Sequence, residues 1–349
     1  SFSVDPRPLD PAVPANPLQK LLFKIMYSKQ DDYEAQLRSM GLLDNDAFTC
    51  TCYQPEVGNR PRRSDILSWA ESSAVVFANS VLGARCNRNS GIIEMFGSIA
   101  GFVPEFGLLT DEGRKATWII EVDCKRKPEA QVLGSAIGMK VMEDVPYIKG
   151  LDRWLGRELT PGTQDYLKDM GAASASNGAV GLYHVDGITP EAVEQCEHLI
   201  APDAQIYRID DAELERIRSS YPVMWKNPGA RPKLAFIGCP HLSSAQLAHW
   251  ADAICDGLSA SGKCRVQVPT VLTAAPSVAD AFRKTAAYRR LSTTGAVVSS
   301  ICPLMYTNNP LCGSMPIITN SNKLRTYSAS RYYTDDEVLA YVTTGKPIK

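Results

Sequence analysis

Two cysteines each follow a short apolar run and precede a proline, an arrangement that can hold thiols at one edge of a sheet. Cys239 ends residues 233–239 and Cys302 ends residues 295–302. The following proline fixes φ and removes one N–H group, and Cys-Pro recurs among the ligands of iron–sulfur clusters. A third candidate thiol lies upstream, in the segment Thr-Cys-Thr-Cys at residues 49–52. Three thiols converging on one crevice would form a metal or iron–sulfur site.

The residue types leave other uses of these thiols open. Each cysteine could be a small buried core residue that stands before a turn. His241, two residues after Cys239, could instead orient a nucleophilic thiol in a metal-free enzyme. Residues 49–52 are too closely spaced for the CxxC pattern of zinc ribbons and have no matching second pair, so the sequence disfavours a structural zinc site. Three thiolates on a cluster would leave one iron position open for substrate, as a Lewis acid.

Polar side chains in two further segments are candidates for binding a carboxylate. The turn at residues 319–325 offers hydroxyls, amides and two cations directly after an apolar run. A helix expected over residues 64–83 is apolar almost all round, which predicts burial, yet it carries a stripe of small polar residues and is followed by Arg85. The stripe could face a ligand cavity or admit a neighbouring helix at close range, and the turn could be an ordinary polar surface turn.

The elements that must position these residues follow a regular order. Apolar runs alternate with helical patterns towards the C-terminus, which predicts parallel strands joined by helices. In such sheets ligands bind beyond the carboxyl ends of the strands, where Cys239 and Cys302 both lie. Upstream, residues 17–41 have a helical pattern, and the small-residue run at 171–181 favours a close crossing of two backbones. The expected C-terminal elements are a strand at 234–238, a helix capped by Ser243 or Ser244 and ending near Ser259, a strand at 265–268, a helix at 278–290 and a strand at 296–301.

Length and composition describe an ordinary globular protein. The 349 residues are enough for about two domains. Apolar residues make up 44%, the formal net charge is -1 and no basic run stands out, so nucleic acid and phospholipid surfaces are not expected as partners. No apolar stretch approaches the roughly 20 residues that span a bilayer. Scattered cysteines and the absence of a signal-peptide pattern predict reduced thiols in the cytoplasm.

Together these segments resemble the aconitase X family, a branch of the aconitase superfamily. The likeness runs from about residue 40 to residue 328, and its long helix motif is highly specific. Members of the family are dehydratases with an iron–sulfur cluster. The residues that carry the likeness are Trp69-Ala-Glu-Ser-Ser-Ala-Val-Val-Phe-Ala-Asn-Ser-Val-Leu-Gly-Ala-Arg85, Thr49-Cys-Thr-Cys-Tyr53, Gly238-Cys-Pro-His241, the strand end at Cys302 and Thr319-Asn-Ser321.

The resemblance implies a ligand set and a substrate pocket. Cys50, Cys239 and Cys302 would hold the cluster, whose type ([2Fe–2S], [3Fe–4S] or [4Fe–4S]) the sequence leaves open. The family motif reads Cys-x-Pro-Tyr at the first site, and Cys52 stands here where proline is usual, so Cys52 is the alternative to Cys50. The implied catalytic residues are Ser72, Ser73, Arg85 and Lys323, and the implied substrate-binding residues are Asn79, Ser321 and His241.

The resemblance also implies how the chain is organised. The expected fold is α/β, with aconitase-like α/β/α three-layer domains and mostly parallel sheets. We expect one aconitase-like domain over residues 1–155, holding both the Thr-Cys-Thr-Cys loop and the helix motif. Residues 156–349 are expected to form α/β structure with the two Cys-Pro strand ends. The small swivelling domain of the family and its N-terminal stretch are not found in this sequence, so a longer polypeptide or a separate subunit is expected to supply them.

The reaction implied by the resemblance is the removal of water from a small hydroxy acid. One group of the family converts cis-3-hydroxy-L-proline to Δ1-pyrroline-2-carboxylate, and another acts on mevalonate 5-phosphate. The phosphate of the second substrate would need additional cations, and no basic cluster stands near the motifs, which favours hydroxyproline. Arg85 and Lys323 would neutralise the carboxylate as charge builds on it. The rival interpretations are a metal-free thiol enzyme that uses Cys239 and His241, and a non-catalytic binding module.

Overall fold

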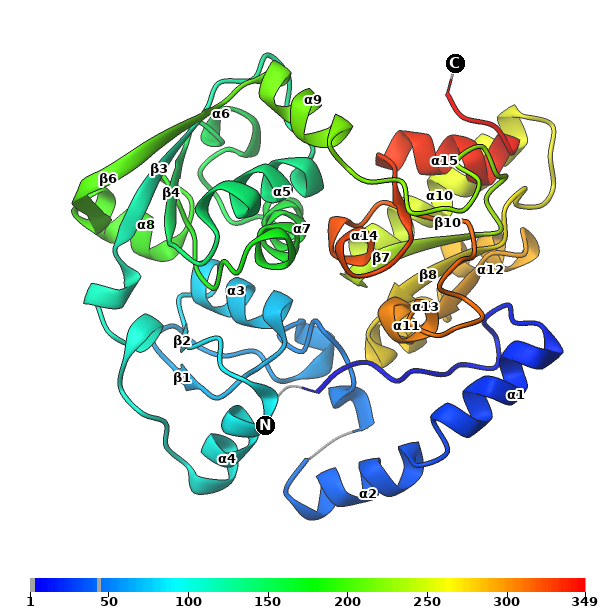
Figure 1. Ribbon diagram of the computed structural model, residues 1–349, viewed down its shortest axis with the longest axis horizontal. Coiled ribbons are helices and arrows are strands. Elements are labelled where there is room, and N and C mark those ends of the chain that lie inside the picture. Colours follow the sequence, from blue (N-terminus) through cyan, green and yellow to red (C-terminus); the bar gives the residue numbers. More distant parts are fainter. Residues whose placement is uncertain (1–3, 43–44, 349) are drawn as a thin grey trace. The chain divides into compact units, whose positions relative to one another are not determined.

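The computed structural model describes residues 4–42 and 45–348, and it divides the chain into two compact units (Figure 1). Unit 1 holds residues 59–221, and unit 2 holds the remaining described residues. This division differs from the expected boundary between residues 155 and 156. That position lies inside unit 1, because strands on both sides of it pair in one sheet. The Thr-Cys-Thr-Cys loop consequently belongs to unit 2 and the helix motif to unit 1.

The main sheet of unit 2 is parallel, with the strand order β11-β10-β7-β8-β9. Alternate residues of its central strand enter opposite cores: Ala235 and Ile237 belong to one apolar cluster, Leu234 and Phe236 to another. Both faces are therefore buried, as in a three-layer α/β structure. The strands are β7 (Leu234–Leu242), β8 (Thr270–Ala274), β9 (Val297–Ser299), β10 (Ile317–Thr319) and β11 (Arg331–Tyr332).

Helices cover both faces of this sheet. On one face, α10, α11, α12 and α15 contribute to the first apolar cluster, and on the other α1, α13 and α14 contribute to the second. The predicted cap of α10 is confirmed, because the Ser243 hydroxyl accepts the backbone N–H of Gln246 at 3.1 Å. The helices are α1 (Pro17–Met26), α2 (Gln30–Ser39), α10 (Ser244–Ala260), α11 (Pro276–Phe282), α12 (Ala286–Thr293), α13 (Pro303–Thr307), α14 (Asn322–Tyr327) and α15 (Asp335–Thr344).

Unit 1 contains a parallel sheet in the order β5-β4-β3-β6 and a short parallel pair, β1-β2. The parallel pairing in both units confirms the predicted sheet type. The strands are β1 (Ile66–Leu67), β2 (Arg85–Cys86), β3 (Ala116–Val122), β4 (Pro146–Lys149), β5 (His184–Val185) and β6 (Ile200–Ile209). The helices are α3 (Ser72–Ser80), α4 (Gly91–Ala100), α5 (Ala130–Val141), α6 (Asp152–Leu155), α7 (Pro161–Asn177), α8 (Pro190–Gln195) and α9 (Asp211–Ser219). Within the described ranges, no helix has the length and apolar character needed to cross a bilayer.

The small-residue run at 171–181 lies largely in α7, where it permits the predicted close crossing. The partner helix is α5, and its Gly134 and Gly138 face α7. A Cβ atom at Gly134 would overlap the carbonyl oxygen of Met170, and one at Gly138 would overlap the carbonyl oxygen of Ser174. The two backbones can therefore approach only because these positions have no side chain.

The helix expected over residues 64–83 is wrong in its length. The helix α3 begins only at Ser72, where the Glu71 carboxylate caps it by accepting the N–H of Ala74 at 2.8 Å. The residues before it are extended, because Ile66 and Leu67 pair with the strand β2. Backbone hydrogen bonds to β2 thus take the place of the first helical turns that the apolar pattern predicts.

Other expected elements are divided or displaced. Residues 17–41 form two helices, α1 and α2, and residues 278–290 span α11 and the start of α12. The strand expected at 265–268 is wrong, because the strand β8 lies at the next apolar run. The N–H group of Gln267 instead donates to a carbonyl oxygen of α15 at 2.7 Å, outside any strand pairing.

Candidate active site

Cys239 lies in β7, the central strand of the unit 2 sheet, three residues before the strand ends at Leu242. It is buried, and it stands in the stretch of β7 where pairing with β8 becomes irregular. Gly238, just before it, has φ +101°, in the left-handed region that favours glycine. The hydroxyl of Thr273 donates to the Gly238 carbonyl, and the hydroxyl of Ser321 donates to the Cys239 carbonyl. Side chains from the two neighbouring strand ends thus fix the backbone around this thiol.

Cys302 follows β9 at the same edge of the sheet and occupies the N-cap position of the short helix α13. Its backbone N–H donates to the carbonyl oxygen of Arg7 at 2.8 Å. Burial raises the pKa of the Cys302 thiol to about 12, and the nearby Cys239 thiol contributes to this rise. The two thiols are therefore near enough for a charge on one to oppose a charge on the other. In the chain without a bound metal, Cys302 is a neutral thiol at physiological pH.

Cys50 is buried in the loop that also contains Cys52. The backbone N–H of His241 donates to the Cys50 Sγ at 3.3 Å. This contact links the loop to β7, two residues beyond Cys239. The contact brings the Cys50 thiol to the strand that carries Cys239.

The His241 ring is buried and bridges two segments. Its Nδ1 lies 2.8 Å from the Thr49 hydroxyl, and its Nε2 lies 3.2 Å from the carbonyl oxygen of Ile301. A carbonyl oxygen only accepts, so Nε2 carries the hydrogen and Nδ1 accepts from Thr49. Each ring nitrogen has a partner other than Cys239, an arrangement that disfavours the metal-free thiol pair of Cys239 and His241.

The expected polar turn after an apolar strand is present between β10 and α14. Ser321 caps α14 by accepting the N–H of Leu324 at 3.1 Å, while its hydroxyl donates to the Cys239 carbonyl. Lys323 lies in the first turn of the same helix and is buried. The turn therefore lies at the carboxyl edge of the sheet, where it contacts the backbone of Cys239. It is not an isolated surface loop.

The thiols of unit 2 are donors of the type that binds iron–sulfur clusters. Among residues 4–42 and 45–348, no group of three or more His, Cys, Asp or Glu side chains is arranged to hold one metal ion. Cys50, Cys239 and Cys302 are all in the thiol form, and their segments are tied together through His241. The chemistry of this donor set fits a cluster.

The helix motif of unit 1 places Ser72 and Ser73 in the first turn of α3. Ser72 is half-buried and Ser73 is buried. Asn79, in the last turn, uses its side chain within the unit. Its amide group donates to the carbonyl oxygens of Cys86 and Gly181, both at 2.8 Å, and its Oδ1 accepts the N–H of Cys86 at 2.8 Å. We expected the Asn79 side chain to bind the substrate. In the structure, its amide atoms instead hydrogen-bond to backbone groups of unit 1.

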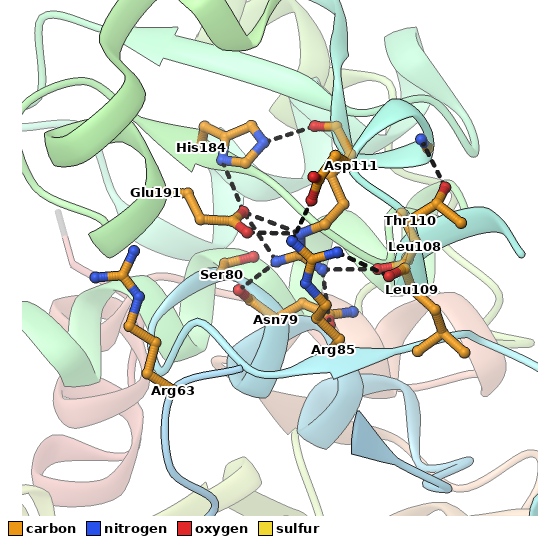
Figure 2. Close-up of polar contacts among 12 residues, drawn as sticks. Arg63, Asn79, Ser80, Arg85, Leu108, Leu109, Thr110, Asp111, His184 and Glu191 are labelled. Atoms are coloured by element: carbon orange, nitrogen blue, oxygen red, sulfur yellow. Dashed lines mark hydrogen bonds and ion pairs between the residues drawn. The ribbon is translucent and has the colours of Figure 1, made fainter. Parts of the chain in front are cut away.

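Arg85 lies in β2 and is anchored on the segment that leads to β3. It donates to the carbonyl oxygen of Leu109 at 2.8 Å and forms an ion pair with Asp111 (Figure 2). Asp111 is exposed, and the Arg85 guanidinium holds the pKa of its carboxyl below the usual range. One edge of the Arg85 guanidinium is therefore paired with a solvent-exposed carboxylate. Another anion could replace this carboxylate.

A buried ion pair behind the helix motif was not predictable from the sequence. Arg114 is 1% exposed, and its Nε donates to both carboxylate oxygens of Glu191, at 2.8 and 3.0 Å. His184 and Asn79 both contact this pair: the His184 Nδ1 lies 3.7 Å from a Glu191 oxygen, and the Asn79 Oδ1 accepts from Arg114 at 3.4 Å (Figure 2). His184 contacts the Arg114 carbonyl through Nε2 at 2.8 Å, and burial lowers its pKa. The two charged residues stand 77 positions apart, and neither has a local motif that would have indicated the pair.

The structure thus distributes the predicted site residues between the units. Unit 2 brings three thiols, His241 and the β10–α14 turn to one edge of a sheet, and unit 1 holds the helix motif with Arg85. The sequence did not indicate the hydrogen bond from Thr49 to the His241 ring or the Arg114–Glu191 ion pair. The predicted residues of unit 2 are Cys50, Cys239, His241, Cys302, Ser321 and Lys323, and those of unit 1 are Ser72, Ser73, Asn79 and Arg85.

Three family models, each describing one domain of aconitase X, match the chain in order. The first domain matches residues 16–112, the second residues 116–219 and the third residues 232–336. The chain belongs to the aconitase X family. The resemblance drawn from the helix motif and the thiol segments is therefore confirmed. The second and third matches coincide with the main sheets of units 1 and 2, whereas the first contributes residues to both units.

Relatives in the aconitase X family are named as dehydratases. The chain is 34% identical to the phosphomevalonate dehydratase large subunit of Thermococcus kodakarensis, over 86% of this chain and 72% of that protein. It is 39% identical to the corresponding large subunit of Methanothermobacter thermautotrophicus, over 56% of this chain and 45% of that protein. It is 31% identical to the cis-3-hydroxy-L-proline dehydratase of Pseudomonas aeruginosa, over 81% of this chain and 47% of that protein. These names confirm the predicted reaction class, a hydro-lyase, and they divide between two substrates.

A solved aconitase X structure has the same fold. The holo-form from Thermococcus kodakaraensis matches with a TM-score of 0.78 and 29% sequence identity, over 97% of this chain and 80% of that chain. Together with the parallel sheets described above, this match confirms the predicted aconitase-like α/β fold.

Proposed function

We propose that this aconitase X chain is the cluster-binding part of an iron–sulfur hydro-lyase that removes water from a small hydroxy acid. The observation that carries the proposal is the set of three cysteine segments tied to His241 at the carboxyl edge of the unit 2 sheet. Membership of a family whose relatives are named dehydratases supports the reaction class.

Cys50, Cys239 and Cys302 would hold the cluster. When bound there, the cluster would supply Lewis-acid chemistry towards a hydroxyl or carboxylate of the substrate. The cysteines must lose their protons to bind it. Because burial and Cys239 raise the pKa of Cys302 to about 12, the loading of this site should release protons at neutral pH.

Cations and hydroxyls of this chain would bind and orient the substrate. Arg85 and Lys323 are our candidates for neutralising the substrate carboxylate, which becomes more negative as the neighbouring α-proton leaves. Ser72 and Ser73 would hydrogen-bond the substrate from the first turn of α3. Asn79 would support this wall of the pocket through its backbone contacts, in place of the direct substrate contact that the sequence suggests.

The substrate that we favour is cis-3-hydroxy-L-proline. Removal of its α-proton and of its hydroxyl as water yields an enamine, which tautomerises to Δ1-pyrroline-2-carboxylate. The supporting observation is that basic side chains around the helix motif already have carboxylate partners in unit 1. These pairs are Arg63 with Glu194 and Arg114 with Glu191, whereas Arg85, which we assign to the substrate carboxylate, would exchange its exposed partner Asp111 for it. A substrate with a single carboxylate needs fewer additional cations than one that also carries phosphate.

Mevalonate 5-phosphate is the second candidate substrate. It is favoured by the 34% identity to the phosphomevalonate dehydratase large subunit of Thermococcus kodakarensis, which extends over 86% of this chain. That relative is named a large subunit. We accordingly propose that this chain works with a small swivelling domain, supplied by the same polypeptide or by a separate subunit, in the cytoplasm.

Two measurements on the full-length protein, together with its small subunit where it has one, test the proposal. Protein purified without oxygen should contain iron and acid-labile sulfide and show a thiolate-to-iron absorption band, which Cys239→Ser with Cys302→Ser should remove. Folded protein that takes up no iron would refute the cluster. Turnover of each substrate is then assayed separately. Formation of Δ1-pyrroline-2-carboxylate supports the first candidate, and consumption of mevalonate 5-phosphate alone would transfer the assignment to the second.

A further inference from the structure

We propose that His241 is a positioning residue which, together with Thr49, fixes the three candidate cluster cysteines relative to one another. The inference rests on the proposed cluster at these cysteines. In this role, His241 would orient the segments that carry the cluster ligands and would not contact the substrate. The evidence is a set of hydrogen bonds inside unit 2.

His241 connects three separate segments of the chain. Its ring Nδ1 accepts a hydrogen bond of 2.8 Å from Thr49, which directly precedes the first thiol of the set. Its ring Nε2 donates at 3.2 Å to the carbonyl oxygen of Ile301, which directly precedes the third thiol. Cys239, the second thiol, lies two residues before His241 in β7. The imidazole therefore contacts the residues that precede the first and third thiols, and His241 lies two positions after the second.

The hydrogen-bond directions around the ring are fixed by its partners. Thr49 Oγ1 accepts the backbone N–H of Thr51 at 3.1 Å and lies 3.1 Å from the Thr51 hydroxyl, which can donate to it, so the Thr49 hydrogen can point to the His241 Nδ1. The Ile301 carbonyl accepts from Nε2, which defines the neutral tautomer of the ring. The ring is also almost completely shielded from solvent. A buried imidazole with one defined tautomer and a partner on each nitrogen is suited to hold neighbouring segments in place.

His241 also contacts one candidate ligand directly. Its backbone N–H donates to the Cys50 Sγ at 3.3 Å. Hydrogen bonds to ligand sulfurs are among the factors that set the electronic properties of iron–sulfur clusters. Because the ring contacts fix the orientation of residue 241, their loss should disturb this N–H···S contact. The cluster should then change in its spectrum as well as in its occupancy.

Substitutions at two positions separate these contacts. His241→Asn keeps an acceptor near Thr49 but is too short to reach Ile301, and His241→Gln keeps a donor for Ile301 without the acceptor for Thr49. Thr49→Val removes the hydroxyl with little change in shape, and Thr49→Ser keeps it. Loss of a residue that orients metal ligands typically lowers metal affinity about 10–100-fold. We expect such a loss in iron affinity, with an altered EPR spectrum, for all of these variants except Thr49→Ser.

The experiment is anaerobic reconstitution of the full-length protein, with iron and sulfide determined per folded chain. His184→Gln is the matched control, because His184 in unit 1 is also buried and its ring also contacts a backbone carbonyl. We expect it to lower the thermal unfolding temperature without changing the iron affinity or the EPR spectrum. Thr49→Val keeps the test decisive if a His241 variant fails to fold.

The outcomes separate this inference from the proposed function. Iron affinity and EPR spectra of Thr49→Val and His241→Gln that match those of the unsubstituted protein would overturn the inference and leave the cluster proposal standing. Folded, unsubstituted protein that binds no iron would overturn the cluster proposal itself. A selective loss in the His241 and Thr49→Val variants, with Thr49→Ser and His184→Gln retaining the unsubstituted affinity, would support the positioning role.

Discussion

The buried ion pair of unit 1 yields a prediction whose magnitude follows from its contacts. Arg114 is 1% exposed and Glu191 is 9% exposed. The guanidinium has an acceptor for each of its N–H groups, among them both Glu191 oxygens, the Leu108 carbonyl at 2.9 Å and the Asn79 carbonyl at 3.1 Å. Glu191→Gln keeps the size of the side chain and removes its charge, which leaves the Arg114 charge buried without a counterion. Removing one partner of a buried pair typically costs about 3–5 kcal/mol.

The assay is urea unfolding followed by hydrogen exchange of peptides from unit 1, because a protein of two units need not unfold in one step. We expect Glu191→Gln to lower the free energy of unfolding of unit 1 by about 3–5 kcal/mol. Arg114→Met should cost at least as much, since it leaves the Glu191 charge buried and deprives the Leu108 and Asn79 carbonyls of a donor. Each such carbonyl adds about 1–3 kcal/mol.

A double-mutant cycle shows whether the charge pair is the cause. In Arg114→Met with Glu191→Leu no buried charge is left, so the double variant should be less destabilised than the sum of the single variants by about 1–3 kcal/mol. Only the cost of the two carbonyls should persist. Additive single and double effects would refute this reasoning, because they would show that the two side chains contribute independently. So would a change below about 1 kcal/mol for Glu191→Gln, a cost typical of an exposed pair.

Three further predictions concern pH, packing and the ligand set. Burial lowers the pKa of His184 in the folded chain, so below about pH 6.5 the unfolded state binds a proton that the folded state does not. The free energy of unfolding should therefore fall as the pH falls. Urea unfolding of the unsubstituted protein and of His184→Gln at several pH values isolates this effect as the difference between the two. Gly134→Ala should destabilise unit 1 by about 1–3 kcal/mol because its Cβ would overlap a carbonyl oxygen of α7, whereas Gly162→Ala, in open space at the start of α7, should not destabilise it in the same assay. Cys50→Ser should lose the bound iron and Cys52→Ser should retain it, as measured by iron content per folded chain, and the reverse pattern would assign the ligand to Cys52.

Much of unit 2 was predictable because local signals agree with its final structure. The alternation of apolar runs and helical patterns correctly predicted a parallel sheet, and Ser243 correctly marked the start of α10. The end of the strand predicted at 234–238 was wrong, because β7 continues to Leu242 and Cys239 lies within it, whereas Cys302 does follow β9. The predicted strand at 265–268 failed because two adjacent runs compete for one place in the sheet, and only tertiary pairing selects the second.

The contacts that organise the candidate site were harder to predict from the sequence. Thr49 and His241 are separated by 192 positions, and the Thr49 hydroxyl carries no local pattern that distinguishes it from other threonines. The same holds for Arg114 and Glu191, which become partners only when η4 (Glu112–Arg114) and α8 are brought together by the sheet of unit 1. Residue types and strand ends could indicate the thiols, but the residues that support them depend on long-range folding.

Asn79 shows why a specific motif is not a list of substrate contacts. The motif from Trp69 to Arg85 identifies the family, and its polar residues suggest a surface that faces a ligand. Yet the Asn79 amide, in α3, hydrogen-bonds to the backbone N–H and carbonyl of Cys86, in β2. The Ser80 hydroxyl accepts the backbone N–H of Tyr183 at 2.9 Å. These polar groups satisfy buried backbone atoms that would otherwise cost about 1–3 kcal/mol each. Part of the motif therefore satisfies backbone groups inside unit 1, and our proposal assigns substrate contacts only to its two ends, in the first turn of α3 and in β2.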